Sequence, residues 1–269
     1  MKTVLITGAS AGFGKLVAEK LLAKGYTVYA AARRVERMQD LEAKGAHVMH
    51  MDVTDNESVK AGVGRVLEEQ QRIDVLFNNA GYGSYGTIED IPLEEIQRQY
   101  DVNVFGMGRL IQAVLPQMRQ QRSGTIINTS SVVGQISTAV VGWYASTKHA
   151  VEAFSDALRM EVKPLGIDVV IIEPGAVKTE FDEVAFGTLD SLDLAEDYKP
   201  LVSGFRKYTG GMYAKCPGPE GTANAVIKAI EARNPKTRYA TTMDAKLLPR
   251  VKRLLTDKLF DKVVLSQMK

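Results

Sequence analysis

The stretch TVLITGASAGFGKLVAEKLL, residues 3–22, decides the fold. It begins with an apolar run, Thr3–Thr7, passes through a glycine-rich turn and enters a pattern of helical spacing over Gly14–Lys24. A buried strand, a glycine turn and a helix in this order favour a nucleotide site. The glycines let the backbone approach a pyrophosphate, and the helix N-terminus supplies N–H donors. The spacing of the glycines is wider than G-x-G-x-x-G; they are Gly8, Gly12 and Gly14.

The alternation of strand and helix continues along the chain. Further strands are predicted at Thr27–Ala32, His47–Met51, Val75–Asn78, Thr125–Thr129, Asp168–Glu173 and Arg238–Thr241, and further helices at Glu57–Gln71, Gln97–Met118, His149–Lys163 and Pro219–Arg233. Continuous Val/Ile/Leu runs separated by helices indicate a parallel sheet covered on both faces. We therefore expect residues 1–269 to form a single α/β domain, a Rossmann-type doubly wound parallel sheet of about seven strands.

Composition excludes several classes of protein. The 34 basic and 32 acidic residues leave a net charge of +2, which argues against a nucleic-acid binder. A single cysteine, Cys216, fits a reducing compartment, and no apolar run is long enough for a transmembrane span. The N-terminus has no signal-peptide pattern, so a cytoplasmic protein is expected. No metal site is expected, since His47, His50 and His149 have no ligand-like spacing.

Two segments depart from the alternation. Residues 176–217 form a long connection that is rich in aromatic residues, which favours a lid over the substrate. Residues 244–269 form an amphipathic extension in which leucines and valines alternate with lysines and arginines. Its apolar side is expected to pack on the domain or the lid. The alternative is that this basic helix lies on an anionic membrane surface.

The residues after the second strand predict the choice of cofactor. The strand ends Ala30-Ala31-Ala32 and is followed by Arg33 and Arg34, with no carboxylate to accept bonds from a ribose 2′-hydroxyl. A guanidinium pairs with phosphate in a forked geometry. NADP(H) is therefore the expected cofactor, with Arg33 as the main contact to the 2′-phosphate and Arg34 as the second. The alternative is that both arginines are merely solvated.

Three side chains predict acid–base chemistry. Tyr144 and Lys148 lie four residues apart in a helical pattern and so share one face. A phenol can protonate a carbonyl that receives hydride. Removing its proton near pH 7 requires its pKa to fall by about 3 units, or ~4 kcal/mol, which a nearby ammonium together with the positive nicotinamide ring of the oxidised cofactor can supply. A serine that follows the strand Thr125–Thr129 can bind the substrate oxygen. Ser130 and Ser131 both qualify.

Taken together, these motifs make the chain resemble the short-chain dehydrogenase/reductase superfamily over nearly its whole length. The family turn T-G-x-x-x-G-x-G is matched from Thr7 to Gly14, with Ser10 and Phe13 inside it, although Phe13 replaces the usual Ile or Leu. The family's Ser–Tyr spacing of about thirteen positions selects Ser131. Further matches for the cofactor site are Asp52, Val53, Asn79, Ala80, Gly81, Pro174, Gly175, Val177 and Thr179, and the match for the catalytic asparagine is Asn103.

The resemblance implies a role for each catalytic residue. Tyr144 is the acid/base, and Lys148 binds the nicotinamide-ribose hydroxyls and lowers the pKa of Tyr144. Ser131 orients the substrate oxygen, while Asn103 helps to hold a water of the proton relay. Within the family, the chain looks similar to the branch that contains the 17β-hydroxysteroid and retinol-type dehydrogenases and bacterial ketoreductases.

The implied reaction is hydride transfer between NADP(H) and a carbonyl or secondary alcohol. Aromatic residues at the expected rim, among them Tyr82, Tyr85 and Trp143 together with Val141, suggest a medium-to-large apolar substrate. Steroid, retinoid, acyl ketone and xenobiotic carbonyl all remain open. A homodimer or homotetramer is favoured, because helices Gln97–Met118 and His149–Lys163 are apolar on more than one face. The rival functions are a catalytically silent NADP(H) sensor and a nucleotide-sugar epimerase, which needs a larger substrate domain.

Overall fold

The computed structural model describes residues 1–268 and contains one parallel sheet of seven strands in the order β3-β2-β1-β4-β5-β6-β7. The strands are β1 (Thr3–Thr7), β2 (Thr27–Ala32), β3 (His47–His50), β4 (Val75–Asn78), β5 (Gly124–Thr129), β6 (Ile167–Glu173) and β7 (Arg238–Ala240). The predicted doubly wound sheet is confirmed. The strand order changes direction between the neighbours β1 and β4, because the chain crosses from β3 back to the other side of β1, and this places a crevice at the carboxyl ends of β1 and β4.

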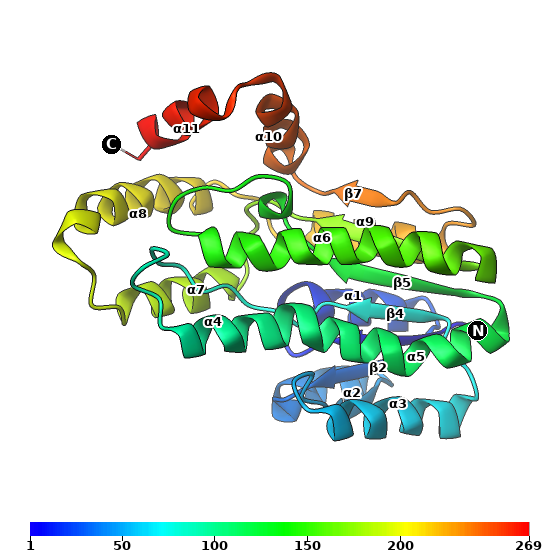
Figure 1. Cartoon of the computed structure of the whole chain (residues 1–269). Coiled ribbons are helices and arrows are strands. Elements are labelled where there is room, and N and C mark those ends of the chain that lie inside the picture. Colours follow the sequence, from blue (N-terminus) through cyan, green and yellow to red (C-terminus); the bar gives the residue numbers. More distant parts are fainter. Residues whose placement is uncertain (269) are drawn as a thin grey trace.

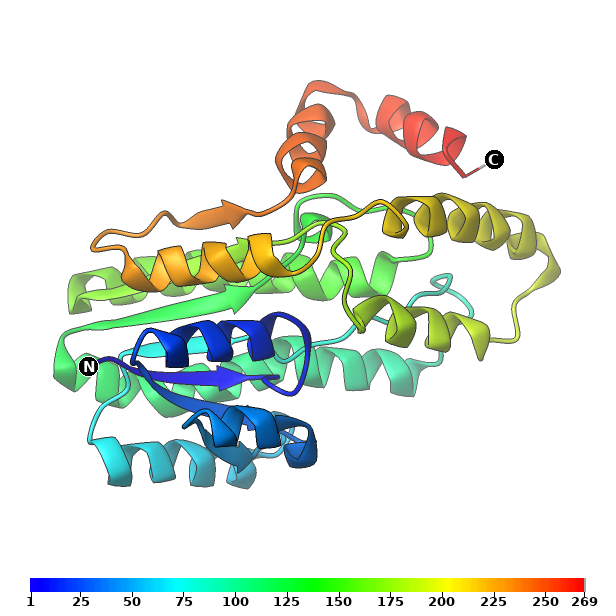
Figure 2. The same cartoon turned by 180° about the vertical axis from the view of Figure 1, so that it is seen from behind.

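Helices cover both faces of the sheet (Figures 1 and 2). On one face α1 (Gly12–Ala23), α2 (Gln39–Ala43) and α9 (Glu220–Glu231) pack on Val4 and Ile6 of β1. On the other face α3 (Asn56–Gln70), α5 (Met107–Gln121) and α6 (Gly142–Val162) pack on Leu5. Successive side chains of a strand point to opposite faces, so one short apolar run stabilises both layers.

Two predicted helices differ from the observed ones. The segment predicted as Gln97–Met118 consists of α4 (Leu93–Tyr100), a π-helical stretch at Asp101–Gly106 and then α5. The helix predicted to begin at His149 begins at Gly142, so that Tyr144 and Lys148 both lie in its first two turns. The reason is compositional: small and polar residues such as Ala145, Ser146 and Thr147 interrupt the apolar period at this end.

The long connection after β6 is largely helical. Residues 176–217 contain α7 (Phe181–Asp190) and α8 (Lys199–Tyr213), which lie beyond the carboxyl ends of the strands (Figure 1). The chain ends with α10 (Met243–Leu254) and α11 (Asp257–Ser266), and α11 lies beside α8 in both views. Within residues 1–268, no helix is long and apolar enough to cross a membrane.

Candidate active site

The glycine turn is interlocked with the segment that follows β4. Gly8 has φ +65° and Gly12 φ +54°, a left-handed conformation that favours glycine. A Cβ on Gly8 would lie 2.9 Å from the Ala80 Cα, so the two backbones are in direct contact. The Thr7 hydroxyl accepts hydrogen bonds from the backbone N–H groups of Asn79 (3.1 Å) and Ala80 (3.2 Å). The structure thus brings together two motifs that are about seventy residues apart in the sequence.

The N-terminus of α1 fits an anionic group. Its N-cap, Ala11, is extended and makes no side-chain capping bond, and the first turn contains no acidic residue. The first N–H groups of a helix carry a partial positive charge and need acceptors from outside the helix. Gly12 faces Thr179 across this end, since a Cβ on Gly12 would lie 3.9 Å from the Thr179 Cβ. A pyrophosphate between these two segments would meet N–H donors on one side and the threonine on the other.

The other predicted cofactor residues are distributed around this turn. Ser10 lies in the turn and Phe13 in the first turn of α1, both half-buried. Val53 is buried against Gly106 of the π-helical stretch. Gly81 lies against Asn103, because a Cβ on it would be 3.0 Å from the Asn103 Oδ1.

Arg33 and Arg34 are exposed at the end of β2, and neither has an ion-pair partner among residues 1–268. Asp52, at the end of β3, lies close enough to Arg33 to feel its charge. Burial raises the pKa of Asp52, but hydrogen bonds from Thr54 and the charge of Arg33 outweigh this effect and hold its pKa below the usual value. The guanidinium of Arg33 is therefore available to a phosphate in this crevice.

The four predicted catalytic side chains are all buried at the carboxyl end of the sheet. Tyr144 and Lys148 come from α6, and Ser131 follows β5. The Lys148 Nζ donates a hydrogen bond to the Thr129 carbonyl (2.9 Å) and lies 5.7 Å from the centroid of the Tyr144 ring. The Ser131 hydroxyl donates to the Pro174 carbonyl (3.4 Å) and accepts from the Val133 N–H (3.3 Å), and its proximity to Tyr144 favours the phenolate. The set has the geometry for proton transfer at one oxygen atom.

Burial dominates the electrostatics of this group. It raises the pKa of Tyr144 well above its usual value of 10, and the nearby Ser131 hydroxyl offsets this only in part. Burial also lowers the pKa of Lys148 to about 8, against the charge of Glu152 one turn along α6. That Lys148 lowers the pKa of Tyr144 stays a prediction, because burial, Ser131 and Tyr213 are the influences that act on this phenol in the structure. Tyr144 is a neutral phenol here, the form that donates a proton.

Asn103 lies within the π-helical stretch, and both polar atoms of its side-chain amide have hydrogen-bond partners. Its Nδ2 donates to the Tyr82 carbonyl (2.8 Å) and the Thr147 hydroxyl (3.1 Å), while its Oδ1 accepts from the Tyr82 N–H (3.0 Å). These bonds fix the π-helical stretch against the loop after β4 and the start of α6. Sequence reasoning missed Thr147, although its position directly before Lys148 places it on an adjacent face of the same helix.

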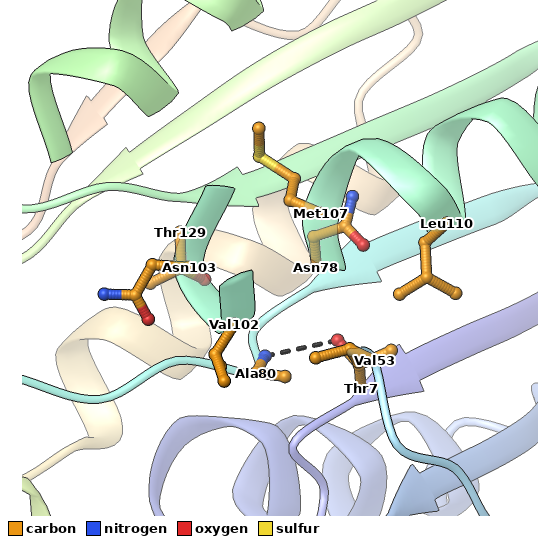
Figure 3. Close-up of a pocket in the computed structure, with 9 residues that line it drawn as sticks. All are labelled: Thr7, Val53, Asn78, Ala80, Val102, Asn103, Met107, Leu110 and Thr129. Atoms are coloured by element: carbon orange, nitrogen blue, oxygen red, sulfur yellow. Dashed lines mark hydrogen bonds between the residues drawn. The ribbon is translucent and has the colours of Figure 1, made fainter. Parts of the chain in front are cut away.

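A small cavity of about 10 Å³ lies behind Asn103, with room for about one water molecule (Figure 3). The Thr129 hydroxyl on its wall is buried without a hydrogen-bond partner. The lining residues come from the ends of three strands and from the helix behind them, and they are Thr7, Val53, Asn78, Ala80, Val102, Asn103, Met107, Leu110 and Thr129.

The Pro174-Gly175 loop is held by the C-terminal part of the chain. The Gly175 N–H donates to the Thr242 hydroxyl (3.0 Å), and the Ala176 N–H donates to the Asp244 carboxylate (3.0 Å). A Cβ on Gly175 would overlap that carboxylate. Val177 is buried just beyond the loop. Thr242 and Asp244 were not predicted as site residues, because nothing near them in the sequence indicates a contact with residues almost seventy positions away.

Aromatic side chains form one wall of the site. The Tyr144 ring lies 5.3 Å from the Phe181 ring of α7 and 6.4 Å from Tyr85, centroid to centroid. Tyr85 also packs edge-on against Phe186 and Phe205, and its hydroxyl lies 3.2 Å from that of Tyr213. Val141 is buried in the same cluster. Trp143 lies outside this cluster, and its indole N–H donates to the Ile88 carbonyl.

A buried cluster of charges lies behind Lys148. Arg238 of β7 contacts Glu152 at 2.9 Å and Glu173 at 3.3 Å, and the Gln135 amide donates to both carboxylates. Burial and the neighbouring Glu152 raise the pKa of Glu173 to about 7. Because this pKa is raised on folding, the contribution of Glu173 to stability is present below pH ~4.5 and is lost as the pH rises through ~7.

We therefore expect Glu173→Gln to remove a pH-dependent loss of stability. The variant should gain about 1 to 3 kcal/mol over the unchanged protein between pH 5 and pH 8. Urea unfolding at both pH values measures this difference. Glu94→Gln, at an exposed carboxylate, is the matched control and should show no such gain. Parallel pH profiles for the unchanged protein and Glu173→Gln would contradict the prediction.

Comparison with known proteins shows the family of the chain. A family model described as short chain dehydrogenase matches residues 2–188. The NADPH-dependent 3-dehydrocapnine reductase of Ornithobacterium rhinotracheale is 33% identical over 100% of this chain and 98% of its own. The 3-ketodihydrosphingosine reductase of Bacteroides thetaiotaomicron is 41% identical over 87% of this chain and 86% of its own. A solved short-chain dehydrogenase from Streptomyces avermitilis is 35% identical and superposes with a TM-score of 0.82, covering 97% of this chain and 96% of its own. The chain therefore belongs to the short-chain dehydrogenase family of oxidoreductases.

Proposed function

We propose that the protein is an NADP(H)-dependent ketoreductase that acts on a ketone with a large apolar body. The observation that carries this proposal is the buried group of Ser131, Tyr144 and Lys148 at the carboxyl end of the sheet, beside a glycine turn that fits a dinucleotide. The exposed Arg33 supports the choice of NADP(H) over NAD(H). The printed name of the relative from Ornithobacterium rhinotracheale, an NADPH-dependent reductase, supports the same choice.

The chain's own residues would transfer the proton and bind the substrate oxygen. The nicotinamide cofactor, when bound, supplies or accepts the hydride. The Tyr144 hydroxyl donates its proton to the carbonyl oxygen that becomes the alcohol, and the reverse reaction returns the proton to Tyr144. The Ser131 hydroxyl holds the same oxygen and stabilises its developing charge. Lys148, fixed by the Thr129 carbonyl, places a cation behind the tyrosine and lies where it can bind the ribose hydroxyls.

The aromatic wall supports an apolar substrate. Tyr85, Phe181, Phe186 and Phe205 contact one another around Tyr144, and we propose that residues 176–217, which supply three of them, are the substrate lid. Two relatives are named as reductases of 3-dehydrocapnine and 3-ketodihydrosphingosine, and these names support a 3-keto compound, while the aromatic wall supports its apolar chain. Steroid- and retinoid-like ketones fit the same chemistry.

A series of 3-keto compounds with lengthening alkyl chains tests this function. Consumption of NADPH should be measured for each compound, and kcat/KM should rise by about fourfold for each CH₂ that the lid buries, because each contributes about 0.8 kcal/mol. The gain should stop when the chain outgrows the pocket. Binding of NADPH without turnover of any ketone would instead favour the silent NADP(H) sensor.

We further propose that the protein is cytoplasmic and is a homodimer or homotetramer assembled through α5 and α6. These two helices lie side by side (Figure 1). Phe154 and Met160 of α6 are exposed, as is Phe105 just before α5. Large apolar side chains exposed on these neighbouring helices favour contact with another copy.

A further inference from the structure

The C-terminal arm, residues 243–268, consists of α10 and α11 and rises from the edge of the sheet at β7 (Figures 1 and 2). One side of the arm packs on the rest of the chain. Ala245 and Phe260 are buried against Val132 and Ile136, and Met268 is buried against the segment that contains α7 and α8. This inner side is the apolar side of the amphipathic extension that was expected to pack on the domain or the lid.

The outer side of α10 is also apolar. Met243, Leu247, Val251 and Leu254 are all exposed, and Leu254 is 85% exposed. Their spacing of four, four and three residues aligns them in one stripe within about 80° of the helix circumference. Isolated exposed leucines are ordinary, but a stripe that runs the length of a helix whose opposite face is already packed points to a second apolar partner.

A basic row lies beside this stripe. Lys246, Arg250 and Arg253 are exposed and occupy the adjacent sector of α10. Among residues 1–268, none of the three has an acidic partner. The cations are therefore not neutralised by the chain itself and face outward beside the apolar stripe.

The second helix repeats the arrangement. Leu259 and Val263 of α11 are exposed one turn apart, and Lys258 and Lys262 are exposed beside them. The inner side of the same helix carries the buried Phe260. Two consecutive helices thus each present an apolar stripe with a basic row, while their opposite sides hold them to the protein.

The charge of the arm differs from that of the rest of the chain. Together with Lys269, which follows it, the arm contains seven of the 34 basic and three of the 32 acidic residues, a net charge of +4, so that the remaining 242 residues have a net charge of −2. Of the three acidic residues, Asp244 binds the Pro174-Gly175 loop and Asp257 is paired with Lys252. A second copy docked on the same surface would bring like-charged rows together, whereas an anionic lipid surface complements both the cations and the apolar stripes.

We propose that α10 and α11 dock the protein on the surface of an anionic membrane. The exposed leucines, valines and Met243 enter the boundary between headgroups and acyl chains, and the two basic rows contact the lipid phosphates. The inner side keeps its packing, so the arm binds without unfolding. Because α11 also contacts the segment of α7 and α8, the docked surface lies next to the proposed lid. The docking itself does not depend on which ketone the enzyme reduces.

Vesicle co-sedimentation of the full-length chain tests the proposal. Vesicles of phosphatidylcholine mixed with phosphatidylserine should bind the protein, those of phosphatidylcholine alone should bind it at least tenfold more weakly, and added salt should release it. The triple variant Lys246→Gln, Arg250→Gln, Arg253→Gln should lower binding to the mixed vesicles by about tenfold or more.

A matched control removes three exposed positive charges elsewhere on the chain. It is the triple variant Lys228→Gln, Arg233→Gln, Lys236→Gln, at positions that lie in and just after α9. Both triple variants lower the net charge by the same amount, so a general loss of charge would weaken vesicle binding equally in the two. The proposal requires that the control bind mixed vesicles as the unchanged protein does.

A further triple variant, Leu247→Gln, Val251→Gln, Leu254→Gln, tests the apolar stripe and should also lose vesicle binding. All variants should keep the melting temperature and NADPH affinity of the unchanged protein, since the substituted side chains are exposed. Failure of the unchanged protein to bind mixed vesicles, or undiminished binding by both arm variants, would overturn the proposal. Light scattering tests whether a second copy of the chain covers the apolar stripe instead. Dissociation of an oligomer by the apolar variant would assign the stripe to contact between copies and would also overturn the proposal.

Discussion

Tyr144→Phe is expected to lower kcat by about 10²- to 10⁴-fold, the usual contribution of a positioned proton donor. The substitution removes only the hydroxyl, and the ring keeps its packing against Phe181 and Tyr85. Stability should therefore change little. The affinity for NADPH should also persist, since the glycine turn and Arg33 are unaffected. The rate of NADPH consumption with a reducible ketone and the Kd for NADPH measure the two effects separately.

Two neighbouring serines extend this prediction: one variant is a second test, and the other is its matched control. Ser131 lies where it can bond the Tyr144 hydroxyl, whereas the neighbouring Ser130 hydroxyl is buried without a partner. Ser131→Ala should reduce kcat and Ser130→Ala should not. Unchanged turnover in Tyr144→Phe would remove the tyrosine from its proposed acid/base role and would leave the fold and the cofactor site standing.

Arg33→Ala is expected to raise the Kd for NADPH by about 10- to 100-fold, because a hydrogen bond to a charged group contributes about 1.5 to 3 kcal/mol. The Kd for NADH, which has no 2′-phosphate, should change little. Arg34→Ala should have the same selectivity with a smaller effect. Titration of each variant with both cofactors measures the difference. Equal losses for NADPH and NADH would refute the assignment of Arg33 to the phosphate.

The sheet was predictable because its signal is local. The runs Thr3–Thr7, Thr27–Ala32 and Val75–Asn78 have the same bounds in the structure as in the sequence-based prediction. Each is a short apolar segment buried on both faces and flanked by glycine, charged or polar residues, so hydrophobicity alone defines its ends. The catalytic set was predictable for a different reason: Tyr144 and Lys148 share a helix, and Ser131 follows a strand that ends at the same edge.

What sequence reasoning missed depends on contacts between distant segments. The π-helical stretch at Asp101–Gly106 has no periodic signal of its own, and Asn103 is fixed there by Tyr82 and Thr147. The cluster of Glu152, Glu173 and Arg238 joins three elements that only the tertiary fold brings together. The pKa of Tyr144 depends on how completely the surrounding side chains exclude water, and no spacing in the sequence encodes that quantity.

The hydrogen bond from the Ala176 N–H to Asp244 has a practical consequence for anyone who shortens this chain. A truncation before α10 would discard the membrane-facing stripe and, with it, the carboxylate that anchors the loop next to the nicotinamide end of the crevice. Such a deletion would mix two effects, impaired nucleotide binding and lost adhesion to lipid. Point substitutions on the outer surface keep them separate.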